Sequence, residues 1–148
     1  MQLKDLLYGV AIKSLVGQPN VEVADLAFDS RAVKNGTLFF AIKGTAVDGH
    51  QFIAKTIEAG AAVIICEDMP TEMASNITFV QVADSSVALG QVASNFHENP
   101  SSKLKLIGVT GTNGKTTIAT LLFQLFRELG YNVGLISTVQ NHINDNII

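Results

Sequence analysis

The chain has 148 residues, of which 47% are apolar, and this predicts a globular protein of about one domain with a packed core. Its 10 basic and 13 acidic side chains leave a formal charge of -3, without the basic excess of proteins that bind nucleic acid or anionic membranes. A single cysteine, Cys66, excludes an internal disulfide, and no apolar run is long enough to span a bilayer, so we expect a cytoplasmic protein with no nucleic-acid or membrane partner.

Strand-like and helix-like segments alternate along the chain. Helical periodicity marks three segments, which end at Gly60, before Pro100 and at Gly130, and Asp84 is the predicted N-cap of the second. Runs of β-branched and aromatic residues mark six predicted strands. In chain order these elements are the strands 24–28 and 37–42, the helix 50–59, the strands 62–66 and 77–82, the helix 85–96, the strand 104–109, the helix 115–129 and the strand 133–136. The alternation predicts an α/β fold, with parallel pairing around the last two strands.

Residues 98–102, Glu-Asn-Pro-Ser-Ser, are the best linker candidate because they join a helix stop to polar turn formers. A boundary there divides the chain into domains 1–100 and 101–148. The second part holds only one helix between two predicted strands, whereas a doubly wound sheet needs several such units to cover its faces. We therefore expect a truncated second domain and, with it, a chain that is a fragment.

Residues 104–117, Leu-Lys-Leu-Ile-Gly-Val-Thr-Gly-Thr-Asn-Gly-Lys-Thr-Thr, run from a predicted strand through glycines into a helix. This context favours a loop whose inward-facing amides hold the phosphates of ATP. Lys115 is the expected bridge to the β- and γ-phosphates, and the Thr116 hydroxyl the expected ligand of Mg²⁺. Val109 stands where the strict phosphate-loop pattern has glycine, so the alternative is a simple tight turn with a solvated Lys115. The candidate ATP-binding residues are Gly111, Thr112, Asn113, Gly114, Lys115, Thr116 and Thr117.

The loop Thr-Gly-Thr-Asn-Gly-Lys-Thr-Thr at 110–117 resembles the ATP loop of the Mur ligases. Upstream, Phe-Asp-Ser-Arg at 28–31, Gly-Thr-Leu-Phe-Phe-Ala-Ile at 36–42 and Asp-Gly-His at 48–50 match the N-terminal domain of that family in the same order. The stretch from Phe96 to Thr112 is similar to the MurE type, whereas MurF ligases usually have serine at the position of Thr112. The resemblance therefore favours the MurE type.

This resemblance implies a small N-terminal α/β domain that binds a uridine nucleotide, followed by the first β-α-β unit of a P-loop ATP-binding domain. In the family, ATP phosphorylates a carboxylate of a UDP-N-acetylmuramoyl dipeptide, and the amine of a diamino acid, meso-diaminopimelate or lysine, displaces phosphate. Lys115 is then catalytic, the enzyme is expected to be a monomer, and the remaining Mg²⁺ ligands and the base are expected beyond Ile148, so that this chain alone does not ligate. The residues implied to contact the UDP moiety are Phe28, Ser30, Thr45, Ala46 and Val47.

Three alternatives remain open at this point: a MurF-type ligase that adds D-Ala-D-Ala, a different P-loop nucleotide hydrolase or kinase, and a non-catalytic nucleotide-binding module. Other conspicuous residues have structural interpretations. We expect Cys66 to be a buried inert thiol and His50 to fix the turn at a helix start. Asp29 and Arg31 are expected to pair, and Lys43 to be an exposed lysine at a strand end, although it could reach a diphosphate.

Overall fold

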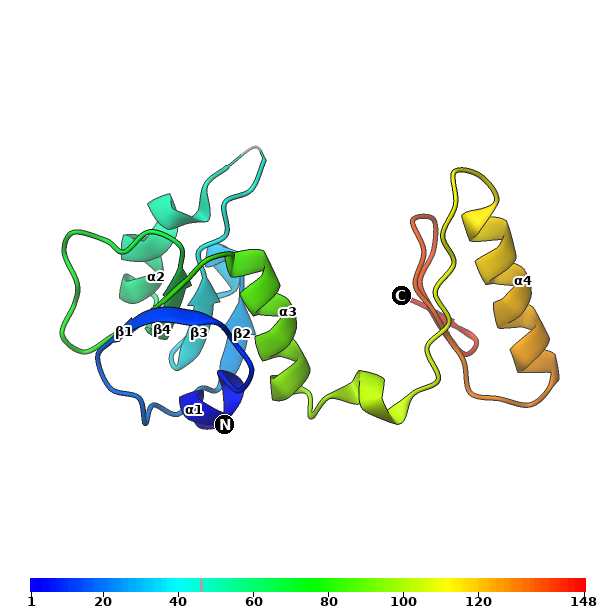
Figure 1. Ribbon diagram of the computed structural model, residues 1–148, viewed down its shortest axis with the longest axis horizontal. Coiled ribbons are helices and arrows are strands. Elements are labelled where there is room, and N and C mark those ends of the chain that lie inside the picture. Colours follow the sequence, from blue (N-terminus) through cyan, green and yellow to red (C-terminus); the bar gives the residue numbers. More distant parts are fainter. Residues whose placement is uncertain (46) are drawn as a thin grey trace. The chain divides into compact units, whose positions relative to one another are not determined.

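The computed structural model describes residues 1–45 and 47–148, which form two compact units, Met1–Leu104 and Lys105–Ile148 (Figure 1). The 3₁₀ helix η3, Pro100–Lys103, precedes the division between them. Among the described residues no helix is long and apolar enough to cross a membrane. The functional assignment of the two parts stays a prediction.

The first unit is built on a mixed sheet in the order β1-β5-β4-β3-β2. Strands β2, β3, β4 and β5 are parallel to one another, and β1 pairs with β5 in the antiparallel direction. The bounds are β1 Ile12–Val16, β2 Asp25–Ala27, β3 Thr37–Phe40, β4 Ala61–Cys66 and β5 Thr78–Val82. The parallel strands put their carboxyl ends on one edge of the sheet, the edge at which open α/β sheets bind ligands. The predicted α/β class is confirmed.

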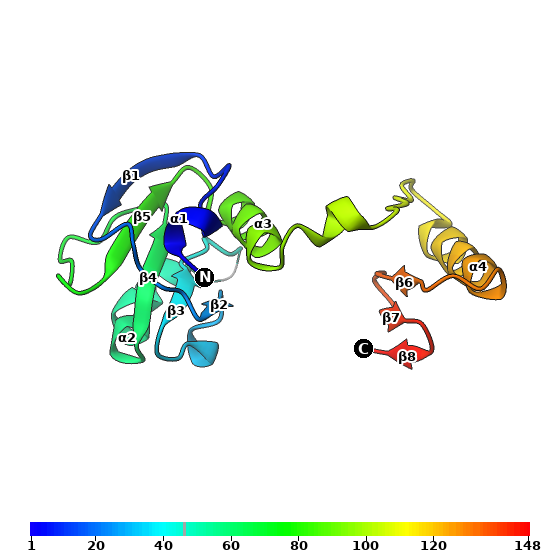
Figure 2. The same cartoon turned by 90° about the horizontal axis from the view of Figure 1, so that it is seen from below.

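Helices cover both faces of this sheet (Figure 2). Side chains of α1, Leu3–Leu6, and α3, Ser85–Phe96, pack with Leu38 and Phe40 of β3 on one face. Ile53 of α2, Ile53–Glu58, packs with Phe39 on the other face. Successive side chains of a strand point to opposite faces, so a strand covered on both sides must be apolar throughout. This explains why β3 and β4 are runs of apolar residues.

Two elements at the start of the chain were not predicted. Helix α1 has a single turn, and β1 is an edge strand whose residues are exposed or half-buried. Asn95 of α3 holds α1 in place, because its buried side-chain amide donates to the carbonyls of Leu6 and Tyr8 at 2.8 Å each. The predicted helix 50–59 begins as the 3₁₀ helix η2, Gly49–Phe52, and continues as α2.

The second unit consists of α4, Lys115–Glu128, and a small antiparallel sheet in the order β6-β7-β8. The strands are β6 Gly134–Leu135, β7 His142–Ile143 and β8 Asn146–Ile147. The predicted strand 104–109 and its parallel pairing with the last predicted strand are wrong. Residues 104–109 find no ladder partner in the part of the chain that the structure describes, and β6 pairs instead with β7. The Ser137 hydroxyl, which donates to the Gln140 carbonyl at 2.7 Å, closes the turn that reverses the chain between them.

Candidate functional site

The predicted phosphate loop is a curled turn between residues 104–110 and α4. Gly111 and Gly114 both have positive φ, 148° and 77°, and L residues rarely adopt the left-handed conformation of Gly114. Gly114 is also the N-cap of α4, and it has no side chain with which to bond the first helical amides. The amides of the first turn therefore lack the side-chain cap that would compete with an anion. This geometry fits the tail of a nucleotide.

Lys115 folds back over the loop. Its ammonium group donates to the carbonyl of Gly111 at 2.6 Å and lies 3.4 Å from the carbonyl of Thr112. The positive charge is thus held beside the curled backbone, where a polyphosphate would meet both the amides and the ammonium. An exposed lysine held by carbonyl oxygens can exchange these neutral acceptors for stronger anionic ones.

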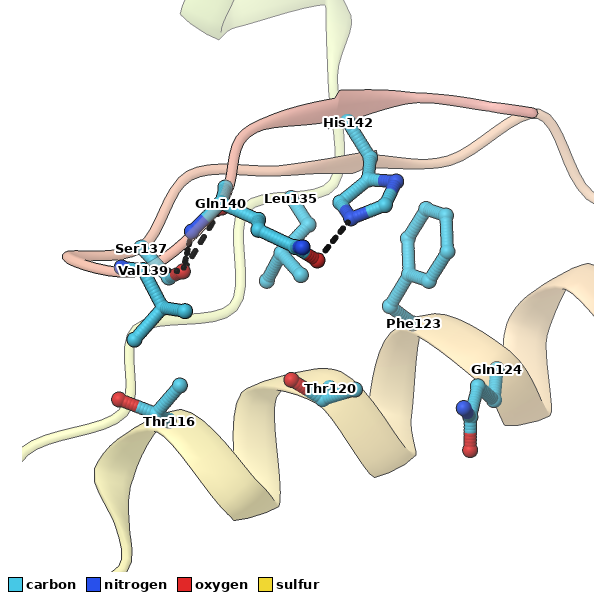
Figure 3. A pocket seen from close by; sticks show the side chains of 9 residues that line it. All are labelled: Thr116, Thr120, Phe123, Gln124, Leu135, Ser137, Val139, Gln140 and His142. Carbon is cyan, nitrogen blue, oxygen red and sulfur yellow. Dashed lines mark hydrogen bonds between the residues drawn. The ribbon is translucent and has the colours of Figure 1, made fainter. Parts of the chain in front are cut away.

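A hollow of about 180 Å³ lies beside Thr116, between α4 and the β6–β7 segment (Figure 3). Its wall carries a hydrogen bond of 3.1 Å between His142 Nε2 and Gln140 Oε1. The ring of His142 lies 5.2 Å from that of Phe123. The sequence reasoning named only Thr116 of this wall, although Thr120, Phe123 and Gln124 lie on the predicted helix, because the opposite wall is formed by a β6–β7 hairpin that it did not predict. The hollow is lined by Thr116, Thr120, Phe123, Gln124, Leu135, Ser137, Val139, Gln140 and His142.

The Thr116 hydroxyl is the one ligand that the sequence assigned to Mg²⁺. Within residues 1–45 and 47–148 no group of three or more His, Cys, Asp or Glu side chains gathers to hold a metal ion. A Mg²⁺ ion bound mainly by nucleotide phosphates and water needs only one or two protein ligands, so Thr116 at the start of α4 fits that role. The assignment stays a prediction.

The predicted uridine-site residues follow the ends of β2 and β3, which are neighbouring parallel strands. Phe28, directly after β2, is 67% exposed, whereas the phenylalanines within the strands, Phe39, Phe40 and Phe79, are buried. Ser30 begins the 3₁₀ helix η1, Ser30–Ala32, whose cap is Asp29. The expected pair of Asp29 and Arg31 is confirmed by a contact of 2.6 Å, and the bonds from Arg31 lower the pKa of Asp29 to about 2.

Thr45 and Val47 lie in an exposed segment after β3, and Ala46 lies outside the described residues. Around them the chain closes on itself, because Lys43 and Asp48 form an antiparallel bridge and the amide of Gly44 donates to the carbonyl of Val47 at 3.1 Å. The carboxyl edge of the sheet therefore presents an exposed aromatic ring, a hydroxyl and a closed turn.

A polar network runs along the same edge. Lys43 contacts Asp68 at 2.6 Å, and this bond lowers the pKa of the Asp68 carboxyl. Glu67 accepts hydrogen bonds from the amide and the hydroxyl of Ser85 at 3.0 and 2.8 Å, so it caps α3 together with the predicted cap Asp84. The sequence reasoning missed Glu67 and Asp68, although their position directly after a buried strand was a usable signal.

Two family descriptions match the chain. "Mur ligase family, catalytic domain" matches residues 22–97, and "Mur ligase middle domain" matches residues 109–147. The chain belongs to the Mur ligase family. The two matches divide the sequence at the same segment as the two compact units, so each candidate site lies within one recognised part of a Mur ligase.

Among curated relatives, the UDP-N-acetylmuramoyl-L-alanyl-D-glutamate--2,6-diaminopimelate ligase of Cytophaga hutchinsonii is 53% identical over 100% of this chain and 31% of its own length. The ligase of the same name from Bacteroides fragilis is 51% identical, and 2,6-diaminopimelate ligase 1 of Clostridium acetobutylicum is 46% identical. Each match covers 30% of the relative's length. The chain thus spans about a third of the length of these Mur ligases. The predicted preference for the MurE type is confirmed by these relatives.

Solved structures give the same fold. A 2,6-diaminopimelate ligase structure aligns with 99% of this chain and 29% of its own, with a TM-score of 0.75 at 22% identity. The D-alanyl-D-alanyl ligase of Acinetobacter baumannii aligns with 86% of this chain and 28% of its own, at a TM-score of 0.64 and 30% identity. The Thermotoga maritima MurF ligase, solved with ADP, aligns with 75% of this chain and 25% of its own, with a TM-score of 0.54 and 27% identity.

Proposed function

We propose that this chain is part of an ATP-dependent, ADP-forming ligase of the MurE type, which adds a diamino acid to UDP-N-acetylmuramoyl-L-Ala-D-Glu. The observation that carries the proposal is that one chain has both an uncapped, curled phosphate loop and a separate parallel sheet with an exposed ring and hydroxyl at its carboxyl edge. The names of the curated relatives favour 2,6-diaminopimelate over lysine as the amino acid.

In the proposed reaction a substrate carboxylate attacks the γ-phosphorus of ATP, and ADP leaves. The amine of the diamino acid then attacks the acyl carbon of the acyl phosphate, inorganic phosphate leaves, and the amine loses a proton. The chain's own contribution lies in the first step. The loop amides at 111–117 orient the phosphates, and the Lys115 ammonium neutralises charge on the γ-phosphate as it is transferred. Mg²⁺ held by Thr116 and the phosphates would supply further charge neutralisation.

The carboxyl edge of the first unit holds the substrate by its uridine nucleotide in this proposal. The ring of Phe28 offers a flat apolar surface to a base, and the Ser30 hydroxyl both donates and accepts hydrogen bonds. The segment carrying Thr45, Ala46 and Val47 supplies further contacts. Binding the remote nucleotide end in this way would fix the position of the reacting carboxylate.

Calorimetric titration of the 148-residue chain with UDP-N-acetylmuramoyl-L-Ala-D-Glu and with UDP tests the uridine site. Both should bind, and Ser30→Ala should weaken both about fivefold to tenfold, since a hydrogen bond is worth about 1 kcal/mol. Ser101→Ala removes an exposed hydroxyl from η3 and should change neither affinity. If neither uridine nucleotide binds, the generic P-loop hydrolase or kinase becomes the better interpretation.

The MurF-type alternative has one observation in its favour, the similarity to MurF structures at 27% to 30% identity. The higher identity to ligases named for 2,6-diaminopimelate outweighs it. A product assay on the complete protein separates the two: dipeptide precursor plus 2,6-diaminopimelate should give ADP and a tripeptide. Turnover only with the tripeptide precursor and D-Ala-D-Ala would establish the MurF type instead.

A further inference from the structure

The His50 ring is held between two segments at the carboxyl edge of the first sheet. Its Nδ1 lies 2.6 Å from Oδ1 of Asp48, and its Nε2 accepts hydrogen bonds from the backbone amides of Glu67 and Asp68 at 3.0 and 3.2 Å. The side chain is only 13% exposed. A single ring thus joins the segment after β3 to the residues that follow β4.

These contacts indicate which nitrogen carries the proton of the neutral ring. A backbone amide can only donate, so Nε2 must carry a lone pair, and the proton of the neutral ring lies on Nδ1, from which it is donated to Asp48. The Asp48 carboxylate also accepts from the amide of His50 at 2.9 Å, and these bonds lower the pKa of Asp48. These contacts therefore match the Nδ1–H tautomer of the neutral ring.

The segment that the ring fastens is the one expected to contact the uridine nucleotide. The backbones of Lys43 and Asp48 form an antiparallel β-bridge, and the amide of Gly49 donates to the carbonyl of Ile42 at 2.8 Å. The two ends of the segment with Thr45 and Val47 are therefore held together next to His50. No backbone ladder joins this segment to the end of β4 in the described part of the chain, since the pairing of β3 with β4 ends at Phe40 and Ile65. The His50 ring supplies that connection, together with the exposed ion pair of Lys43 and Asp68.

We propose that His50 is a positioning residue of the uridine-nucleotide site: it clamps the segment with Thr45 and Val47 to the end of β4, and the clamp holds only while Nε2 is unprotonated. This inference rests on the proposed function, because it assigns His50 to the same substrate site. His50 acts through the segment that it fixes, and it need not touch the substrate.

Protonation of Nε2 turns an acceptor into a donor that faces two other donors, so the bonds to both amides are lost. The charged groups around the ring are Asp48 on its own segment, Lys43 after β3, and Glu67 and Asp68 after β4. Asp68 is paired with Lys43, and Glu67 bonds to Ser85. A cationic ring keeps its attraction to Asp48 but loses its connection to β4. Uridine-nucleotide affinity should therefore fall on acidification.

The test is calorimetric titration of the 148-residue chain with UDP-N-acetylglucosamine, a diphosphate diester whose own charge is constant over the interval from about pH 5 to about pH 8, in which histidine side chains titrate. We expect the affinity to fall about tenfold across this interval, corresponding to two lost backbone hydrogen bonds of about 0.5–1 kcal/mol each. His50→Gln keeps an acceptor that does not titrate, so its affinity should be near that of the original chain at high pH and independent of pH. His50→Phe should bind weakly throughout. His97→Gln removes a histidine outside the network and should keep the full pH dependence.

Nitrogen-15 NMR of the His50 ring measures its tautomer in the absence of a ligand. The Nδ1–H tautomer is expected at about pH 8. An Nε2–H tautomer would overturn the proposal, as would a pH dependence that persists in His50→Gln. Absence of binding by the original chain, with the expected tautomer present, would instead remove the uridine site and with it the proposed function. Binding by the original chain and by a folded His50→Phe with equal affinity at every pH would remove the positioning role alone.

Discussion

Gly49 stands between the cap Asp48 and the clamp His50 at a point where two backbone segments nearly touch. A Cβ built on Gly49 would lie 2.7 Å from the nitrogen and 2.8 Å from the oxygen of Ile42. Both neighbours are backbone atoms that cannot rotate away. Gly49→Ala must therefore push the start of η2 away from the end of β3.

The cost has two parts. Overpacking against a fixed backbone costs about 1–3 kcal/mol, and the bond of 2.8 Å between the Gly49 amide and the Ile42 carbonyl contributes about 1 kcal/mol that is lost when the segments separate. The expected decrease in the free energy of unfolding is therefore about 2–4 kcal/mol. Because Thr45 and Val47 lie on the segment that joins β3 to η2, uridine-nucleotide affinity should fall as well.

Urea titration followed by the NMR amide signals of β4 reports the stability of the first unit alone. Gly90→Ala is the matched control, since it makes the same chemical change in the interior of α3, where an added Cβ meets nothing within 4 Å. That variant should be more stable by about 0.5–1 kcal/mol, because alanine is the better helix former. Shifts of the same sign in the two variants would refute the close-approach argument.

Three further predictions concern single side chains. Burial raises the pKa of the Cys66 thiol to about 11, so Cys66 should not react with iodoacetamide at neutral pH until urea unfolds the chain. The hydrogen bonds from Arg31 lower the pKa of Asp29 from 3.8 to about 2, so a ¹³C carboxyl titration should have its midpoint there, and Arg31→Ala should move it up towards 3.8. The folded pKa is the lower one, so the stability from this pair is present above the unfolded value and is lost as the pH falls through about 2. Lys115→Met should weaken ATP–Mg²⁺ binding at least about tenfold by fluorescence anisotropy, since a charged hydrogen bond is worth about 1.5–3 kcal/mol, while Lys105→Met should leave it unchanged; equal losses in the two variants would contradict the loop assignment.

The elements that the sequence predicted well are those fixed by local signals. Helix α3 begins and ends where predicted, because the carboxylate of Asp84 accepts from the amides of Ser86 and Val87 at 2.8 and 2.9 Å and Pro100 follows soon after its end. The central strands β3, β4 and β5 were found because burial on both faces makes them rich in apolar residues.

The elements that were missed or wrong depend on partners distant in the sequence. Strand β1 is recognised only through its ladder with β5, since Ile12–Val16 has no clear apolar face of its own. Residues 104–109 have the composition of a buried strand, but Leu106 and Ile107 are largely exposed and join no ladder with the other residues that the structure describes. Composition shows that a segment could form a buried strand, but the strand forms only where a neighbouring backbone pairs with it.

For the candidate sites, the sequence motifs predicted the segments that form each site, but they predicted few of the contacts within it. Arg31 pairs with Asp29 two positions away, and such local pairs can be read from spacing. The bonds of His50 to the amides of Glu67 and Asp68 join residues 17 and 18 positions apart, and they arise only because β3 and β4 are parallel neighbours. Sequence reasoning gave His50 a turn-fixing role but could not give its partners, and so it could not give its tautomer.

Two glycines of the candidate sites are required for different physical reasons. Gly114 has a φ of 77° with no atom near a built Cβ, so it is required for backbone conformation, whereas Gly49 is required for space beside Ile42. Each is followed by a residue whose side chain turns back to bond neighbouring backbone: Lys115 to the Gly111 carbonyl and His50 to the amides after β4. A glycine followed by a residue that bonds the backbone is thus common to both candidate sites, but the partners of Lys115 lie in its own loop, whereas those of His50 are brought to it by the parallel pairing of β3 and β4.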